Sequence, residues 1–251
     1  MKANQIKKIK SLKNKYILYI NGNEYTIDPY FYECILPYNN KVLDVKTMLY
    51  VIAFSNSYEV ISKLYKKIFD HSISTYEVKV KLKSKEISDE HINLVIEFLK
   101  NEGHLKEEDF INHYKEIYQY KKGYNAFKRF LESKHISSYS INKAMDNYIE
   151  NEEYALEYAN KFITSKVNSN KMLKMKLIAS LTNKGFSNVT INNVINQLNF
   201  NDDEDNLKKE IIKYIKKYRD DKYKVISKLA SKGYNVNKIK KVMEEGMYFE
   251  N

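Results

Sequence analysis

The sequence predicts a mainly α-helical protein: four tandem three-helix repeats that form a curved solenoid, preceded by a small N-terminal β-hairpin or three-stranded sheet. Three observations predict this fold. A short pattern returns four times at nearly constant spacing, which indicates one structural unit used repeatedly. The 251 residues contain only 2 prolines and 6 glycines, so long stretches are free to be helical. Residues 1–45 lack the pattern and are rich in β-branched and aromatic side chains.

These first 45 residues form the predicted β-rich extension. Two short runs, Tyr16 to Ile20 and Tyr25 to Ile27, consist mostly of strand-type residues. Asn21-Gly22 between them is a strong signal for a two-residue hairpin turn, because both residue types tolerate positive φ. An earlier run, Ile6 to Leu12, is expected to add a third strand. From about Asp44 onward the chain is predicted to be helical.

The repeated pattern has seven positions: leucine, two variable residues, lysine, a fifth residue, an apolar residue, and serine or asparagine. We call each copy a corner. An isoleucine follows each apolar residue by five positions. The four corners begin at Leu82, Leu131, Leu181 and Leu229, at spacings of 49, 50 and 48 residues, and their fifth residues are Glu86, His135, Gly185 and Gly233.

Each corner is interpreted as the end of one helix and the start of the next. Glycine at the fifth position adopts without strain the left-handed conformation in which helices commonly end. The serine or asparagine is a preferred N-cap, and the apolar residue and the isoleucine stand at the two positions of a hydrophobic staple. Glu86 and His135 replace glycine, and a left-handed residue of this kind costs roughly 1–2 kcal/mol. These two corners are therefore expected to be looser or differently shaped.

The corners divide the rest of the chain into four predicted repeats. Each has room for three helices. Apolar side chains recur at helical spacing, as in Ile61, Leu64 and Ile68. Ser74 followed by Glu77 predicts a capping box at the start of a second helix. The predicted repeats are residues 46–102, 103–150, 151–200 and 201–251.

Composition points to a soluble cytoplasmic protein. The 43 basic and 32 acidic residues give a net charge of +11, which favours an anionic partner, although the richness in Lys, Asn, Ile and Tyr together is also typical of an AT-rich genome. Cys34 is the one cysteine, so no internal disulfide forms, which suits a reducing compartment. No apolar run approaches the ~18 residues of a membrane span, and Tyr16 to Ile20 is too short for a signal peptide.

Catalytic motifs are absent from the sequence, which contains no GxGxxG, P-loop, HExxH or CxxC. His113 follows Asp109 by four residues on a predicted helix, so the two could form half a metal site, but a solvated ion pair is the expected arrangement. Glu107, Glu108 and Asp109 are interpreted as first-turn acids that favour the helix dipole. We expect no catalysis, no cofactor and no bound metal.

Basic side chains recur on or near the middle helices of two repeats. Any one lysine on a helix is usually a solvated side chain, but a recurring set is a better candidate for contact with phosphate or with an acidic protein surface. The candidates for binding are Lys121, Lys122, Lys128, Arg129 and Lys134 in the second repeat, and Lys171, Lys174, Lys176 and Lys184 in the third repeat.

On these residues the chain resembles the RecX family, bacterial regulators of the RecA recombinase. The corners are similar to the family's pattern of leucine, Lys-Gly, an apolar residue and an N-cap. Residues 103–110 resemble its Tyr-Leu-Asp-Asp segment and following helix, and Lys122-Gly123-Tyr124 leading into Phe127 resembles its Lys-Gly-Pro segment. The N-terminal hairpin and the fourth repeat are similar to the longer form found in low-GC Gram-positive bacteria. The chain departs from the family pattern at His104, Lys106, Tyr124 and His135.

The resemblance implies a regulator without catalytic activity. The family binds the RecA filament on single-stranded DNA, in the filament's helical groove, and reduces its recombinase, ATPase and co-protease activities in DNA repair and the SOS response. We expect this chain to act as a monomer in the cytoplasm, to contact single-stranded DNA directly or through RecA, and to have no membrane partner. The alternative is a helical-repeat DNA-binding protein that acts independently of RecA.

Overall fold

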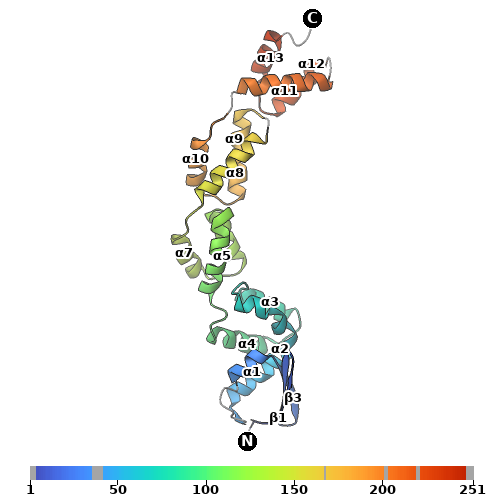
Figure 1. Cartoon of the computed structure of the whole chain (residues 1–251), viewed down its shortest axis with the longest axis vertical. Helices are drawn as coiled ribbons and strands as arrows, with labels where there is room; N and C mark the ends of the chain where they lie inside the picture. The colour runs from blue at the N-terminus through green and yellow to red at the C-terminus, as the bar shows by residue number, and fades with distance from the viewer. Residues whose placement is uncertain (1–3, 36–41, 167, 201–202, 219–220, 247–251) are drawn as a thin grey trace. The chain divides into compact units, whose positions relative to one another are not determined.

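The computed structural model describes residues 4–35, 42–166, 168–200, 203–218 and 221–246 (Figure 1). It consists mainly of helices, with a small antiparallel sheet in the N-terminal part of the chain, so the predicted fold class is confirmed. The chain divides into two compact units. Unit 1 comprises Met1–Glu116 and Phe130–Asp146, and unit 2 comprises Ile117–Arg129 and Asn147–Asn251. Across the described residues, no helix combines the length and apolar character that a membrane span requires.

The sheet of unit 1 has four strands in the order β3-β2-β1-β4. β1 (Asn4–Leu12), β2 (Lys15–Ile20) and β3 (Asn23–Ile27) are the predicted hairpin and third strand, paired antiparallel. The predicted turn has φ of 51° at Asn21 and 85° at Gly22, as a two-residue hairpin loop of this sequence requires. β4 (Val42–Leu43) pairs with the first two residues of β1 and was not predicted, because two residues carry no periodicity.

Aromatic packing joins this sheet segment to the first long helix. Asp28 accepts the Phe31 N–H at 2.7 Å and so begins α1 (Pro29–Ile35). Phe31 stacks on Phe54 of α2 (Val45–Phe69) at 3.9 Å between ring centroids, and both contact Phe98 edge to face. All three rings lie in the core of unit 1, so the β-rich extension is docked on the first repeat.

In the described residues from Val45 onward, twelve helices follow one another, three to each predicted repeat. Ser74 and Glu77 form the predicted capping box at the second of them, each side chain accepting the other residue's N–H. After α2, the helices are α3 (Thr75–Lys83) and α4 (Asp89–Asn101), α5 (Glu107–Lys121), α6 (Tyr124–Ser133) and α7 (Ser138–Asp146), α8 (Glu152–Thr164), α9 (Asn170–Asn183) and α10 (Asn188–Gln197), and α11 (Asp203–Tyr218), α12 (Lys222–Ser231) and α13 (Val236–Glu245).

All four corners have one backbone conformation. The fifth residue is left-handed in each, with φ of 58° at Glu86, 54° at His135, 87° at Gly185 and 88° at Gly233. The N–H of the following apolar residue bonds to the carbonyl of the corner's leucine, as Phe186 does to Leu181 at 3.1 Å. The N–H of the fifth residue bonds to the carbonyl three positions earlier. These two bonds define the Schellman motif, which places the leucine and the apolar residue at its hydrophobic contact.

The expectation that the corners at Glu86 and His135 are looser or differently shaped is wrong. Both non-glycine residues adopt the left-handed conformation of the glycines, and both corners keep the two Schellman bonds. The predicted N-caps are also present at all four corners. The side-chain oxygens of Ser88, Ser137, Ser187 and Asn235 each accept the N–H three residues later, at 3.3–3.4 Å.

Candidate interaction surface

The middle helices of the repeats concentrate basic residues. α9 and α12 each contain three lysines and no acidic residue, and α3 contains three lysines and one glutamate. By contrast, α5 and α8 begin with clusters of acidic residues. Lysines without an acidic residue on the same helix are therefore found on α9 and α12, while α2 and α11 carry several lysines together with acidic residues.

Around α6, most of the predicted basic residues are available to a partner. Lys121, Lys122 and Arg129 are exposed and Lys128 is half-buried. Lys121 Nζ lies 5.3 Å from the ring centroid of Tyr120. The other three form no ion pair with any residue that the structure describes. Within the described part of the chain, their charges are consequently not neutralised.

The three candidate lysines on α9 are all exposed, but they differ in their neighbours. Lys174 Nζ lies 4.8 Å from the centroid of the Phe200 ring, and Lys176 Nζ donates to Asn168 Oδ1 at 3.3 Å. Lys171 has no ion-pair partner among the described residues. Lys171 is thus the α9 lysine most free to meet an external anion.

The two candidates that belong to corners have a different environment. Lys134 Nζ lies 2.6 Å from Glu77 Oε1, and the two side chains are 27% and 30% exposed. Lys184 Nζ donates to the Tyr154 hydroxyl at 3.4 Å and lies 4.3 Å from the centroid of the Tyr158 ring. Both lysines contact side chains of the same chain, so they are weaker candidates for binding than the lysines of the helix surfaces.

The middle helices are positioned by a contact that recurs three times among the described residues, which we call a junction: the start of a middle helix meets the corner of the following repeat. In unit 1, the Tyr76 ring stacks on His135 with centroids 3.7 Å apart, and Glu77 pairs with Lys134. Burial raises the pKa of Glu77, but hydrogen bonds from Lys134 and the Ser74 N–H outweigh burial and hold the pKa below its usual value.

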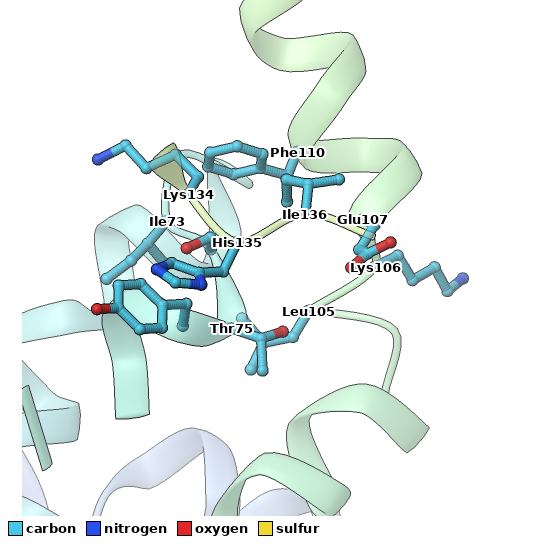
Figure 2. A pocket seen from close by; sticks show the side chains of 11 residues that line it. Ile73, Thr75, Leu105, Lys106, Glu107, Phe110, Lys134, His135 and Ile136 are labelled. Atoms are coloured by element: carbon cyan, nitrogen blue, oxygen red, sulfur yellow. The ribbon is translucent and has the colours of Figure 1, made fainter. Parts of the chain in front are cut away.

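A cavity of about 20 Å³ lies at this junction (Figure 2). His135, Ile136 and Phe110 from the second repeat surround it together with Ile73 of the first, while the Lys106 side chain points away from it. A space of this size holds about one water molecule. The cavity is therefore a gap in the packing of the junction and is too small for a ligand.

In unit 2, the junction between α6 and the third corner uses backbone groups. The Gly123 N–H donates to the Lys184 carbonyl at 3.1 Å, and the Asn125 N–H donates to the Gly185 carbonyl at 2.8 Å. A Cβ on Gly185 would lie 2.7 Å from Ala126 Cα, and one on Gly123 would overlap the backbone of the corner. Glycine is thus required here for close approach as well as for its left-handed conformation.

The fourth corner repeats this arrangement with the start of α9. The Ser169 N–H donates to the Lys232 carbonyl at 3.1 Å. A Cβ on Gly233 would lie 2.6 Å from Ser169 Oγ and 2.8 Å from Met172 Cβ. Sequence reasoning assigned the corner glycines to helix termination alone and missed their role in joining repeats.

Comparison with known proteins places this architecture in a family. The chain is 32% identical over 184 residues to "Regulatory protein RecX" of Staphylococcus haemolyticus (strain JCSC1435), an alignment that covers 67% of this chain and 68% of that protein. This chain belongs to the RecX family. The corresponding protein of Staphylococcus epidermidis (strain ATCC 12228 / FDA PCI 1200) is 30% identical over 195 residues, covering 72% of this chain and 71% of that protein. The resemblance inferred from the corners is thereby confirmed.

A solved structure supports the fold of this RecX-family chain. A crystal structure of regulatory protein RecX superposes with a TM-score of 0.54, covering 77% of this chain and 99% of that chain at 17% identity. At this level of identity the superposition shows a shared fold. No model of a protein family matches the sequence.

Two carboxylates hold the N-termini of helices in this RecX-family chain, and sequence reasoning missed both roles. Glu150 accepts the Tyr124 N–H at 2.7 Å, the Ser187 N–H at 2.9 Å and the Thr190 hydroxyl at 2.5 Å, so it links the start of α6 to the third corner. Glu107 accepts the N–H and hydroxyl of Ser137, at 3.1 and 2.6 Å. Glu107 had been interpreted only as a first-turn acid of α5. The sequence signal in both cases is a glutamate near a helix start, which does not reveal a partner 26 to 40 residues away.

The histidines pair differently from the expectation. Asp109 lies 4.0 Å from His71 Nδ1, so the ion pair expected with His113 is not the one observed. Tyr30 and His104 share a hydrogen bond of 2.5 Å, and burial lowers the pKa of His104 with help from the charge of His71. Among the described residues, no three His, Cys, Asp or Glu side chains are grouped to bind a metal ion.

Proposed function

We propose that this chain is a regulator without catalytic activity that binds the RecA filament on single-stranded DNA, in the filament's groove, and lowers its recombinase, ATPase and co-protease activities. The observation that carries the proposal is its sequence relationship to proteins named "Regulatory protein RecX". An array of repeats with a basic helix in each supports it, because many weak contacts along a filament give avidity across several protomers.

The contact surface we propose consists of the basic residues of α6 and α9 that form no ion pair with the residues the structure describes. Arg129 and Lys171 are its best representatives, since both are exposed and neither forms an ion pair with a described residue. Lysine and arginine contacts to phosphate or acidic surface weaken with salt. Lys134 and Lys184 are left out of the central test because of their contacts within the chain.

The test is a titration of RecA's DNA-dependent ATPase with the purified protein. We expect inhibition at or below one molecule per RecA protomer, and weaker inhibition by the double variant Arg129→Glu/Lys171→Glu. The matched control is Lys161→Glu/Lys241→Glu, which changes the net charge equally at exposed lysines of unit 2 that pair with Glu157 and Glu245. No inhibition by the unaltered protein across that range would disprove the proposal, and equal loss in the two variants would remove the proposed surface.

The alternative, DNA binding without RecA, is favoured by one observation: α9 and α12 carry lysines without acidic residues. It predicts that the protein alone retards single-stranded DNA in a gel near physiological ionic strength. Failure to bind DNA even at low salt would eliminate this alternative and leave the RecA proposal intact.

A further inference from the structure

A second basic site lies in unit 1, apart from the basic residues of α6 and α9. A cleft of about 170 Å³ opens between α2 and α3. Val60 and Leu64 of α2 provide its apolar part. The remaining lining residues are polar or charged: Glu59, Lys63, Lys81, Ser84 and Lys85.

The three lysines of this cleft are not neutralised by any residue that the structure describes. All three are exposed, and none forms an ion pair with a residue in the described ranges. Two other lysines of the same helices are paired: Lys46 of α2 lies 2.8 Å from Glu97, and Lys83 of α3 lies 3.0 Å from Asp89. The cleft thus gathers three cations with a single carboxylate, Glu59, among them.

Comparison with the other corners explains why this cleft is cationic. Lys85 is the lysine of the first corner, and its equivalent in the fourth corner, Lys232, pairs with Glu210 of the same repeat. Glu210 precedes Lys232 by 22 residues. The residue 22 positions before Lys85 is Lys63. The position that holds a neutralising glutamate in the fourth repeat therefore holds a lysine in the first repeat, which adds a second positive charge beside Lys85.

We propose that this cleft binds phosphate groups, either those of a single-stranded nucleic acid or that of a free nucleotide. Three lysines and one glutamate leave a net charge of +2, which one phosphomonoester of about −1.5 to −2 or two successive phosphodiesters balance. A phosphate has enough oxygens for three ammonium groups to donate to it, whereas a carboxylate has only two oxygens. Three lysines therefore suit a phosphate better than a carboxylate. The apolar side chains of Val60 and Leu64 then face the sugar or base. This site does not depend on regulation of RecA, and its test contains no RecA.

The experiment measures binding of a fluorescein-labelled oligothymidylate by anisotropy, and of inorganic pyrophosphate by NMR of the lysine side chains. The test variant is Lys63→Gln/Lys81→Gln/Lys85→Gln. Its matched control, Lys66→Gln/Lys79→Gln/Lys83→Gln, removes the same charge from the same two helices outside the cleft. Circular dichroism spectra of both variants serve as the control for folding.

We expect the test variant to bind the oligothymidylate about tenfold more weakly. The slope of log Kd against log salt should fall by about 1.4, since the cleft holds two phosphodiesters and each single-strand phosphate contact contributes roughly 0.7. The control should change Kd by less than about twofold. If both pyrophosphate and the oligothymidylate bind the cleft, it accepts the phosphates of free nucleotides as well as those of a strand. If only the oligothymidylate binds, the cleft is a site for single-stranded nucleic acid. Equal weakening of oligothymidylate binding in both variants would overturn the proposal. So would binding of polyglutamate, but of neither pyrophosphate nor oligothymidylate, to the three lysines.

Glu59 gives an independent arm of the same test. Removing its negative charge by Glu59→Gln should tighten oligothymidylate binding by about threefold, because it lies among the lysines. Glu90→Gln makes the same change in net charge at an exposed position of α4 and should leave Kd unchanged. If the two substitutions act alike, the cleft is not the binding site.

Discussion

Gly185 provides the sharpest test of the junction in unit 2, because Gly22 is a matched comparison. The two have nearly equal φ, +87° and +85°, but only Gly185 has close neighbours. A Cβ on Gly185 would lie 2.7 Å from Ala126 Cα, whereas nothing lies within 4 Å of a Cβ on Gly22. Gly22→Ala thus introduces backbone strain alone, about 1–2 kcal/mol. Gly185→Ala adds an overlap that separates the corner from α6.

This separation breaks two backbone hydrogen bonds, each worth roughly 0.5–1.5 kcal/mol. We therefore expect Gly185→Ala to lower the free energy of unfolding by about 2–5 kcal/mol, against about 1–2 kcal/mol for Gly22→Ala. Urea unfolding followed by circular dichroism measures both values. Amide exchange at Gly123 and Asn125 should accelerate in Gly185→Ala. Equal costs for the two substitutions, with both amides still protected, would refute the requirement for a corner without a Cβ.

Three further substitutions test the corners and junctions. Glu150→Gln should lower the free energy of unfolding of unit 2 by about 3 kcal/mol in urea, because backbone and hydroxyl donors lose a charged acceptor. A loss below about 0.5 kcal/mol would contradict the role of Glu150 in linking α6 to the third corner. The folded-state pKa of Glu77 is lowered, so its ionised form stabilises unit 1 above its ordinary pKa of 4.5, and that stability is lost as pH falls through the lowered value. Lys134→Met should weaken this acid-induced loss in thermal melts below pH 4.5, and an unchanged difference between neutral and acidic melts would exclude the pair as its source. Glu86→Gly should raise the midpoint of urea unfolding slightly, since relief of about 1–2 kcal/mol of left-handed strain exceeds the roughly 0.5–1 kcal/mol entropic cost of glycine; a lower midpoint would show that the glutamate makes a favourable contact.

The corners were predictable because their determinants are local. A leucine, a left-handed residue, an apolar residue and an N-cap lie within seven positions, and each type has one strong conformational preference. The hairpin at Asn21-Gly22 was predictable for the same reason. Where the prediction of corner shape failed, at Glu86 and His135, two Schellman bonds and the capped helix that follows impose the left-handed conformation despite its cost.

The junctions and the candidate surfaces were less predictable because they depend on distant pairs. Nothing near Lys134 in the sequence shows that Glu77 neutralises it, and nothing near Gly185 shows that Ala126 leaves no room for a Cβ. The sequence distinguished basic helices from acidic ones, but it could not distinguish a lysine with a partner from one without. That difference separates Lys134 from Lys171, and it separates Lys85 from the lysines of the other three corners.

The backbone junctions of unit 2 have a consequence for how such a chain can grow and diverge. A bond between two peptide groups carries no information about the side chains on either side. Glycine at the corner and an N–H at the start of the middle helix supply these bonds, so the bonds themselves would be kept when the side chains around them change. The junction in unit 1 works differently, because it is made by side chains: the Tyr76 ring stacks on His135, and Glu77 pairs with Lys134. There a substitution in one repeat alters its contact with the next, so divergence at this junction involves residues of two repeats at once.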